Sequence, residues 1–512
     1  MASYERYREY ATASAADLAA NNPVLQAGQL AVESDTGLMK VGNGSTAYTS
    51  LPYGPTSLTS LTLLNATANG VLYANGSGQL TSVAGFTFDG TNAVLHGSIS
   101  ASEFVDTEAS FSWDSATATP GSSIGAAPKT TVIHQNMRRC VVNDSGVVQY
   151  YLLGTDSTKK ADGNTATLTG ADGQVMVEIP KFYTRRTVAG TVTTWSISSV
   201  PRTGYTVHPA FIKDGVEVPY RYIGAYDACV YDVSAAAYIS GLNWDNNSGA
   251  SNGVEVDVTA STGDKLSSVS GVYPMVGLTR AEFRTIAANR GAGWRQLDWT
   301  LFAAVQLLYL VEFQSFFSQN ITGAGNTGTS YAASSGTQTD NGGSEAGKSN
   351  SIGNASTNIT NGASSASRQV AWMSYRGIEN IYGNEWNFVD GVIVNPDGSV
   401  GTDAGDWWFT NNSSSFSDSV RTGMSQITAS AATGSNYVSA IAAVDNFFIA
   451  TSVSGGSSST YLTDYHYGSA SADRVVVVGG RAGDGADAGL FFVGANNDAS
   501  LRNRNFGARL AF

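Results

Sequence analysis

The sequence predicts a mostly β N-terminal region followed by a larger α+β domain, and three observations support this fold class. The 512-residue chain contains 57 glycines and 10% aromatic residues but only 13% charged residues, a composition that favours many turns and few solvated helices. Short β-branched or aromatic runs, bounded by glycines or by Asn-Gly and Asp-Gly pairs, recur along most of the chain. The two stronger helical patterns both lie between residues 279 and 315.

Residues 1–57 predict a small β module. The alanine-rich stretch from Ser14 to Asn22 begins at a residue suited to an N-cap and is followed by Pro23, which favours a short helix or a collar-like coil. After it, residues 25–53 contain short strands separated by Gly-containing turns. A paired-carboxylate site at Glu33 and Asp35 is a weaker interpretation than a solvated turn.

Residues 58–127 predict a thin β shaft. The segment is rich in Ser, Thr, Ala and Gly, and its strands, such as Val71 to Ala74 and Phe86 to Phe88, contain few large apolar residues. Strands this short cannot close a good core within one chain, so we expect neighbouring chains to supply the burial. A flexible monomeric linker is the alternative.

The larger domain is expected to span residues 128–512. It opens with a hairpin at Val141 to Leu153, a strand from Ala171 to Arg186, and two strands across Asp214-Gly215 within Val207 to Val230. A helix with a capping box follows at Thr279 to Asn289. The next helix, Leu297 to Ser315, is apolar nearly all round, but its polar residues leave too short a run for a bilayer. We therefore predict a buried core helix that packs against the C-terminal strands.

Residues 320–368 form a Gly/Ser/Asn/Thr-rich insertion that is expected to be a long surface excursion, because such a run cannot build its own core. Residues Val370 to Val394 again have a sequence typical of regular structure, and the rings of Trp372, Trp386 and Phe388 are expected to pack in the core. A sugar-stacking platform is the alternative for these rings. Glu379 and Glu385 are the best acid and base candidates for a glycosidase, which needs two carboxyls flanking one bond.

The last stretch, Arg474 to Phe512, predicts strands at Val475 to Val478, Leu490 to Val493 and Phe506 to Phe512, so the chain is expected to end inside a sheet. The loops between these strands are rich in Arg, Asp and Asn. Polar loops on a rigid scaffold are a common way to build a binding surface.

Charge and motifs exclude several function classes. The net charge of -13 disfavours a nucleic-acid partner and an anionic membrane. Cys140 and Cys229 are too few for a disulfide framework and are expected to be buried thiols.

No P-loop, HExxH or GxSxG motif occurs, so no cofactor or catalytic residue is predicted. Residues 397–406 contain clustered aspartates, for which a plain turn is favoured over a calcium site and no metal is predicted. The charged N-terminus MASYERYREY does not indicate a signal peptide.

Four parts of the sequence show a family resemblance. Residues 25–53 resemble a module found near the N-termini of phage tail fibres. The C-terminal skeleton resembles the signature of phage receptor-binding proteins related to the major tropism determinant, with an alanine at Ala482 where members often carry an aromatic residue. The matching positions are Gly479, Gly480, Gly485, Ala488, Gly489, Phe491, Asn497, Ala499, Ser500, Gly507, Arg509 and Leu510. The opening strands of the domain and the segment SYRGIENIYGNEWNFVDG resemble lectin-like tail proteins as well.

The resemblance implies a phage tail fibre or receptor-binding protein, not an enzyme, whose α+β domain has a C-type-lectin-like fold. The N-terminal module would attach to virion tail or baseplate proteins, and the protein would be an elongated homotrimer made in the host cytoplasm and released by lysis. Some members are diversified in this last segment by a retroelement. A tail-associated polysaccharide depolymerase and a purely structural virion fibre protein are the alternatives, although no β-helix repeat period is visible.

The resemblance also implies a receptor site, in which glycines such as Gly479 and Gly489 carry the fold and the residues between them face outward. Strand alternation after Phe491 predicts that Phe492 points outward. Tyr461, Tyr465 and Tyr467 on the preceding loop are weaker additions to this surface. The predicted host-receptor residues are Arg481, Asp484, Asp487, Phe492, Gly494, Asn496, Leu501, Arg502, Arg504 and Phe506.

Overall fold

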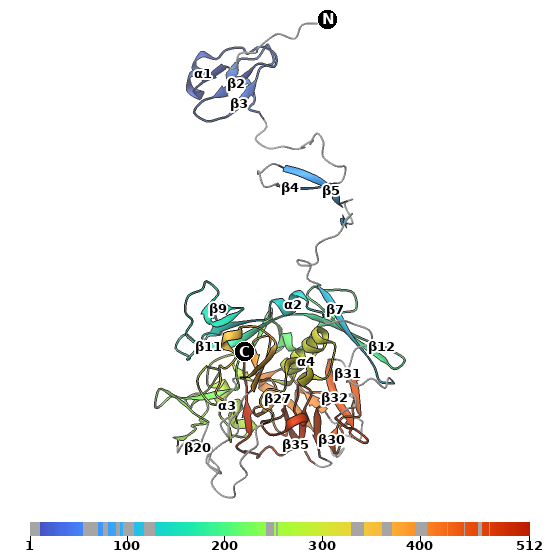
Figure 1. The fold of residues 1–512 in the computed structure, drawn as a ribbon. Coiled ribbons are helices and arrows are strands. Elements are labelled where there is room, and N and C mark those ends of the chain that lie inside the picture. Colours follow the sequence, from blue (N-terminus) through green and yellow to red (C-terminus); the bar gives the residue numbers. More distant parts are fainter. Residues whose placement is uncertain are drawn as a thin grey trace. The chain divides into compact units, whose positions relative to one another are not determined.

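The computed structural model describes residues 11–54, 70–74, 80–88, 93–95, 107–116, 129–241, 250–251, 254–328, 343–360, 371–395, 407–427, 429–444, 446–458, 463–469 and 472–512. The chain divides into an N-terminal unit, residues 1–104, and a C-terminal unit, residues 105–512, and both are mostly β (Figure 1). β7 (Glu108–Asp114) pairs with β13 (Val192–Ser198). The larger domain therefore begins before residue 128, inside the range predicted as shaft.

The N-terminal unit contains the predicted short helix and β strands. Ser14 accepts a hydrogen bond from the Asp17 N–H at 3.2 Å and caps α1, which ends at Asn22 in the left-handed conformation. The unit's sheets have the orders β1-β2-β3 and β4-β5-β6. Its elements are β1 (Ala11–Ala13), α1 (Ala15–Asn21), β2 (Leu30–Glu33), β3 (Met39–Val41), η1 (Tyr48–Ser50), β4 (Gly70–Ala74), β5 (Leu80–Phe88) and β6 (Ala93–Leu95).

The C-terminal unit contains two large sheets. The seven-stranded sheet has the order β10-β9-β8-β11-β17-β37-β23, with β8 (Arg138–Val142), β9 (Val148–Leu153), β10 (Asp156–Lys160), β11 (Gln174–Pro180), β17 (Tyr220–Gly224), β23 (Arg295–Gln296) and β37 (Leu510–Ala511). The predicted hairpin at residues 141–153 is β8 and β9. β37 lies between β17 and β23, so the last described strand lies inside a sheet, as predicted. The single strand predicted from Phe506 to Phe512 is wrong, because residues 506–508 pair with a strand of the other large sheet and only residues 510–511 belong to this one.

The eight-stranded sheet has the order β29-β28-β27-β34-β35-β33-β30, and β36 also pairs with β27. Its strands are β27 (Trp386–Val394), β28 (Trp407–Phe409), β29 (Ser425–Ile427), β30 (Ser435–Tyr437), β33 (Tyr465–Gly468), β34 (Arg474–Val478), β35 (Val493–Asn497) and β36 (Phe506–Ala508). β35 and β30 lie at the lower side of the larger unit in Figure 1, away from β9 and β11.

Smaller sheets and short helices complete the unit. β14-β12-β13-β7, β19-β18-β22 and β24-β25-β26 are sheets, and β15-β16, β20-β21 and β31-β32 are hairpins. These strands are β12 (Tyr183–Ala189), β14 (Thr206–Val207), β15 (Ile212–Lys213), β16 (Val216–Glu217), β18 (Cys229–Asp232), β19 (Ala237–Ile239), β20 (Ala250–Ser251), β21 (Val254–Glu255), β22 (Lys265–Ser267), β24 (Thr357–Thr360), β25 (Ala371–Tyr375), β26 (Ile378–Glu379), β31 (Ala440–Val444) and β32 (Phe447–Ser452). The helices are α2 (Val132–Gln135), η2 (Pro209–Phe211), α3 (Arg280–Ala288), α4 (Trp299–Phe313), α5 (Ser318–Thr322), η3 (Asn350–Ile352), η4 (Ser413–Ser415) and η5 (Gly485–Asp487).

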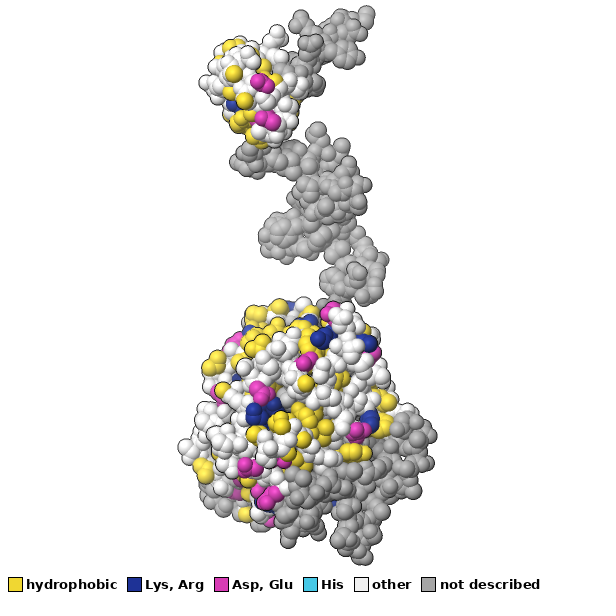
Figure 2. All heavy atoms as spheres, turned by 90° about the vertical axis from the view of Figure 1, so that its left-hand side faces the viewer, with side chains coloured by type: hydrophobic (Ala, Val, Ile, Leu, Met, Phe, Trp, Pro, Cys, Tyr) yellow, Lys and Arg dark blue, Asp and Glu magenta, His cyan; other side chains and the backbone are white. Residues whose placement is uncertain are grey.

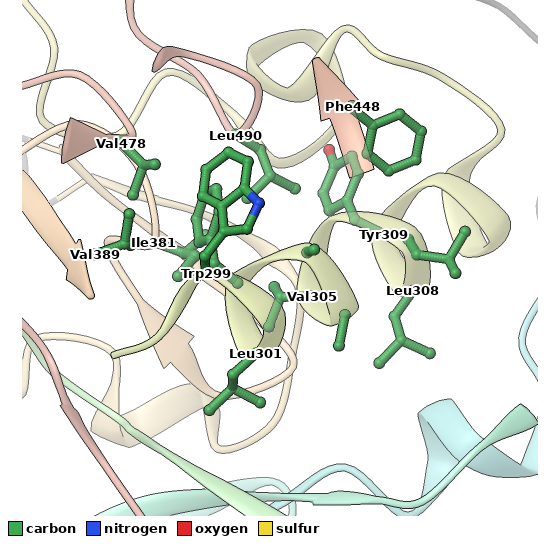
Figure 3. Packing of buried hydrophobic residues seen from close by; sticks show 14 of the residues in the cluster. Trp299, Leu301, Val305, Leu308, Tyr309, Ile381, Val389, Phe448, Val478 and Leu490 are labelled. Atoms are coloured by element: carbon green, nitrogen blue, oxygen red, sulfur yellow. The ribbon is translucent and has the colours of Figure 1, made fainter. Parts of the chain in front are cut away.

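Both predicted helices of the larger domain are present. Thr279 and Glu282 form the capping box of α3, and α4 is capped by Asp298, whose carboxylate accepts the Leu301 N–H at 2.9 Å. α4 is buried almost all round, and Figure 3 shows its side chains packed among Val389, Val478 and Leu490. We call this apolar cluster the α4 core. The prediction that the helix is buried against C-terminal strands is confirmed.

The insertion at residues 320–368 differs from the prediction near Ser349, while other described residues of it, such as Ile321, are exposed. Ser349 and Asn350 are buried, and both hydrogen-bond to the buried guanidinium of Arg139. Glu379 accepts the Gly347 N–H at 2.8 Å and the Ser349 N–H at 2.6 Å. This part of the insertion is therefore fixed in a buried polar network, not a surface excursion, because distant charged residues satisfy its backbone and its side chains.

Candidate binding surface

One face of the eight-stranded sheet is buried at one end and partly exposed at the other. The register places Phe388, Val477, Gly494 and Tyr467 opposite one another in turn across β27, β34, β35 and β33, so they share a face. Phe388 packs under Phe283 of α3 in an apolar cluster that we call the α3 core. Beyond this helix, the rings of the same face are only partly buried.

Three of these partly exposed rings form what we call the tyrosine ridge: Tyr437, Tyr465 and Tyr467. Tyr437 lies directly opposite Tyr465, and Tyr465 and Tyr467 point to the same face because side chains alternate along a strand. The ring centroids are 5.2 Å apart for Tyr437 and Tyr465, and 4.8 Å apart for Tyr465 and Tyr467. The Tyr437 hydroxyl donates to Asp487, and the Tyr465 hydroxyl donates to the Ser435 carbonyl at 2.9 Å. These bonds hold the rings in place.

Trp386 continues the ridge and is held on several sides. Its indole stacks on Phe492 at 6.1 Å, and the guanidinium carbon of Arg481 lies 4.4 Å from its ring centroid. Its Nε1–H donates to Asp484 at 2.8 Å, and Asp484 also accepts from the Arg481 Nε–H at 3.0 Å. The Tyr467 ring lies 6.3 Å away. Trp386, Arg481 and Asp484 therefore form a fixed, partly exposed unit beside the ridge.

Burial and charge shift the pKa values of this surface. Burial, followed by the hydrogen bond to Asp487, raises the pKa of Tyr437 to about 12. The pKa of Tyr467 is raised by burial and then by Asp484 and Asp487, while Arg481 acts in the opposite direction. Burial also raises the pKa of Asp484, against the effect of Arg481. Burial is therefore the largest cause of the shifts at Tyr437 and Tyr467, and the carboxylates beside them act in the same direction.

The structure brings part of the predicted receptor residues to the surface. Arg481, Asp484 and Asp487 surround Trp386 and Tyr437, as described above. On the loop after β35, Asn496 is exposed, Leu501 packs partly against the α3 core, and Arg502 pairs with Glu282 at 2.6 Å. Arg504 is half-buried. Six of these seven residues are partly or fully exposed, whereas the Asp484 side chain is only 8% exposed. Their contact with a receptor stays a prediction.

Three predicted receptor residues are buried, so their assignment to the surface was wrong. Residues 490–492 are not in a strand: the Phe492 N–H bonds to the Gly489 carbonyl in a turn, which directs Phe492 into the α3 core. Phe506 is buried against Trp386 and Phe388, with centroids at 4.9 and 5.5 Å. Gly494 is also buried, and a Cβ there would lie 2.7 Å from Val477 Cγ2.

Sequence reasoning missed Tyr437 and the partial exposure of Trp386. The ridge could have been predicted in part, because the Tyr-x-Tyr spacing at residues 465–467 places both rings on the same face of a strand. Trp372 and Phe388 are buried, as predicted. Tyr461 lies outside the described residues.

The structure buries the acid, base and thiol candidates that the sequence suggested for other chemistry. Glu379 and Glu385 are both buried, and the Glu379 carboxylate is used by two backbone N–H groups. Cys140 and Cys229 are buried free thiols, as predicted. Among the described residues there is no group of three His, Cys, Asp or Glu side chains that could hold a metal ion, and the aspartates at 397–406 lie outside them. No described helix has the length and apolarity needed to cross a membrane.

A buried carboxyl beneath the surface loop gives a prediction for pH dependence. Burial raises the pKa of Asp464 to about 7. Its carboxylate accepts the Phe491 N–H at 2.8 Å, and the buried hydroxyls of Tyr309 and Tyr382 feel its charge. The folded state therefore holds a proton that the unfolded state releases near pH 4, so stability should fall as pH rises from about 4 to about 7.

We expect Asp464→Asn to remove this pH dependence. A pKa difference of this size between the folded and unfolded states changes the free energy of unfolding by on the order of 4 kcal/mol. Urea unfolding of both proteins at a series of pH values measures it. Asp498→Asn is the matched control, because the Asp498 side chain is 71% exposed. A parental protein whose unfolding free energy is the same at both ends of this range would contradict the prediction.

Comparison with known proteins gives a limited result. No protein-family model matches the chain, and no curated protein matches it. Among solved structures, the chain is similar to the Major Tropism Determinant P3c variant (TM-score 0.24, 13% identity), the U1 variant (0.22, 12%) and the I1 variant (0.23, 11%), each alignment covering 98% of both chains. TM-scores this low do not establish a common fold.

Proposed function

We propose that this protein is a phage tail-fibre receptor-binding protein whose C-terminal unit binds a host cell-surface receptor through the tyrosine ridge and the adjoining Trp386, Arg481 and Asp484. The observation that carries the proposal is the ridge itself, in which aromatic rings fixed by hydrogen bonds remain partly exposed at the end of a buried sheet face. Tyr, Trp and Arg dominate binding hot spots. The motif resemblance in residues 479–510 supports the same role.

The same proposal covers the finer features implied by the resemblance. The C-terminal unit would be C-type-lectin-like, residues 474–512 would be open to retroelement diversification, and the N-terminal unit would attach to tail or baseplate proteins of the virion. The ridge would bind without catalysis; Glu379 and Glu385, the acid and base candidates, are both buried, and Glu379 accepts two backbone hydrogen bonds. The net charge of -13 supports a partner other than nucleic acid.

Replacing Tyr465 and Tyr467 together by Ala is expected to lower adsorption to host cells about 30-fold or more, because a central aromatic contact contributes about 2 kcal/mol or more. Labelled parental protein is first bound to a panel of bacterial strains, and a strain that retains it is used for the variants. Tyr220→Ala is the matched control, since Tyr220 is 42% exposed elsewhere on the unit. A folded double variant that adsorbs at the parental rate would place the receptor site elsewhere.

The N-terminal unit supports the homotrimer that we propose. In β3, Met39 and Val41 are 46% and 47% exposed, whereas Lys40 between them is buried. The buried apolar residues that form the unit's described cluster are only Leu18, Leu25, Ala31, Tyr48 and Leu51. A core this small seldom suffices for a separate fold. Association of copies through the apolar side of β3 would supply the missing burial.

Sedimentation equilibrium is expected to give three times the 53.3 kDa chain mass. Val41→Lys should weaken the assembly, because it places a charge on the apolar side of β3. The matched control is Val188→Lys, at a similarly exposed valine of the C-terminal unit. A folded monomer at micromolar concentration would contradict the prediction.

A further inference from the structure

We infer that the tyrosine ridge binds a cationic side chain, a lysine or arginine of a protein receptor. The inference rests on the proposed function, because it names the chemical class of ligand for the same surface. It is carried by the rings, the charges next to them and a contact that the protein itself already makes.

The charge balance beside the ridge is negative. Asp484 is paired with Arg481, with 3.0 Å between Nε and Oδ1. Asp487 instead accepts from the neutral hydroxyl of Tyr437, and among the described residues no ion pair offsets its charge. A ligand that brings a positive charge to the ridge would therefore be attracted, and a neutral ligand would leave the charge of Asp487 without a partner.

The aromatic rings of the ridge also favour a positively charged ligand. The face of an aromatic ring carries partial negative charge, and a cation above it gains about 0.5 to 2 kcal/mol. The surface already contains one such contact, because the guanidinium of Arg481 lies over Trp386 at 4.4 Å. A second cation above Tyr467 or Tyr465 would repeat this arrangement next to it.

The geometry suits a side chain better than a flat sugar chain. The planes of Tyr437 and Tyr465 differ by 77°, and those of Tyr465 and Tyr467 by 50°, so the rings make a ridged wall, not one continuous platform. The Tyr437 and Tyr465 hydroxyls are already used in hydrogen bonds within the protein. They are therefore less available to the hydroxyl groups of a saccharide.

The test uses Asp487→Asn, which keeps a carbonyl oxygen for the Tyr437 hydroxyl and the size of the side chain but removes the charge. Adsorption of the full-length protein is measured on the bacterial strain that retains the parental protein. We expect the variant to adsorb about tenfold more weakly at low salt, since a close charge pair is worth about 1.4 kcal/mol or more. Asp498→Asn, which removes an exposed carboxylate paired with Arg474, is the matched control and should leave adsorption unchanged.

Competition separates a cation from a neutral group of the same shape. Nα-acetyl-arginine amide at millimolar concentration should reduce parental adsorption, whereas Nα-acetyl-citrulline amide, its neutral isostere, should not, with ionic strength matched by NaCl. Equal competition by the two amides would overturn the inference.

The variants also separate this inference from the proposed function. If the Tyr465 and Tyr467 double variant loses adsorption while Asp487→Asn retains it, the ridge is the receptor site but its ligand is not a cation, and a glycan then becomes the better candidate. If neither variant changes adsorption, both the inference and the proposed site are overturned.

Discussion

Leu308→Asp is expected to leave the protein insoluble or unfolded. Leu308 is fully buried in the middle of α4, which is surrounded by apolar side chains in the α4 core (Figure 3). A carboxylate placed there has neither water nor a cation, and it costs several kcal/mol even after protonation. Because a typical domain is stable by about 5 to 15 kcal/mol in total, this is a large share. Solubility on expression and circular dichroism of any soluble fraction measure the effect.

The same change at an exposed apolar position provides the control. Val188, at the end of β12, is 55% exposed, so Val188→Asp should change the unfolding free energy by no more than about 0.5 kcal/mol. On the face that Figure 2 draws, charged side chains lie scattered among polar and apolar ones, and one more is expected to be tolerated. Soluble Leu308→Asp protein with parental unfolding behaviour would show that α4 is not the centre of the core.

The second large effect is expected from Arg509→Met. Arg509 is fully buried, pairs with Asp227 at 2.5 Å, and donates to the Gly224, Glu379 and Asn380 carbonyls at 2.8 to 3.0 Å. Removing the guanidinium leaves Asp227 charged and buried without its cation, which typically costs about 3 to 5 kcal/mol. Burial already raises the pKa of Asp227 against the opposing effect of Arg509. Urea unfolding monitored by tryptophan fluorescence measures the loss.

A double variant tests the cause. Arg509→Met combined with Asp227→Leu removes both charges and should recover part of the lost stability, because a pair of apolar residues has no unpaired charge to bury. If the double variant is no more stable than Arg509→Met alone, the loss comes from the hydrogen bonds to the three carbonyls and not from the charge of Asp227.

Elements with local signals could be predicted from the sequence. The capping box of α3 needs only Thr279 and Glu282, three residues apart, and the apolar run of α4 is buried whatever surrounds it. The β8 and β9 hairpin was set by the turn between its strands. In each case the residues that determine the element lie close together in the sequence, so the element can be predicted without knowing which distant residues contact it.

Other features depend on contacts between distant residues. The run from Leu490 to Val493 looks like a strand, but the carboxylate of Asp464 accepts the Phe491 N–H and helps to hold a turn there. The insertion near Ser349 is buried because Glu379 and Arg139 bond to it. Trp386 is partly exposed because it begins its strand at an edge of the α3 core. None of these partners can be identified from spacing along the sequence.

The position of β37 has a consequence for protein synthesis. Leu510 and Ala511 join β17, near residue 222, to β23, near residue 295. Until Ala511 has left the ribosome, these two strands lack the strand between them, and the Ala225 to Ala228 segment lacks the Arg509 partner of Asp227. The seven-stranded sheet can therefore close only after translation has passed residue 511. A nascent chain that stalls earlier lacks β37 and therefore cannot complete this sheet.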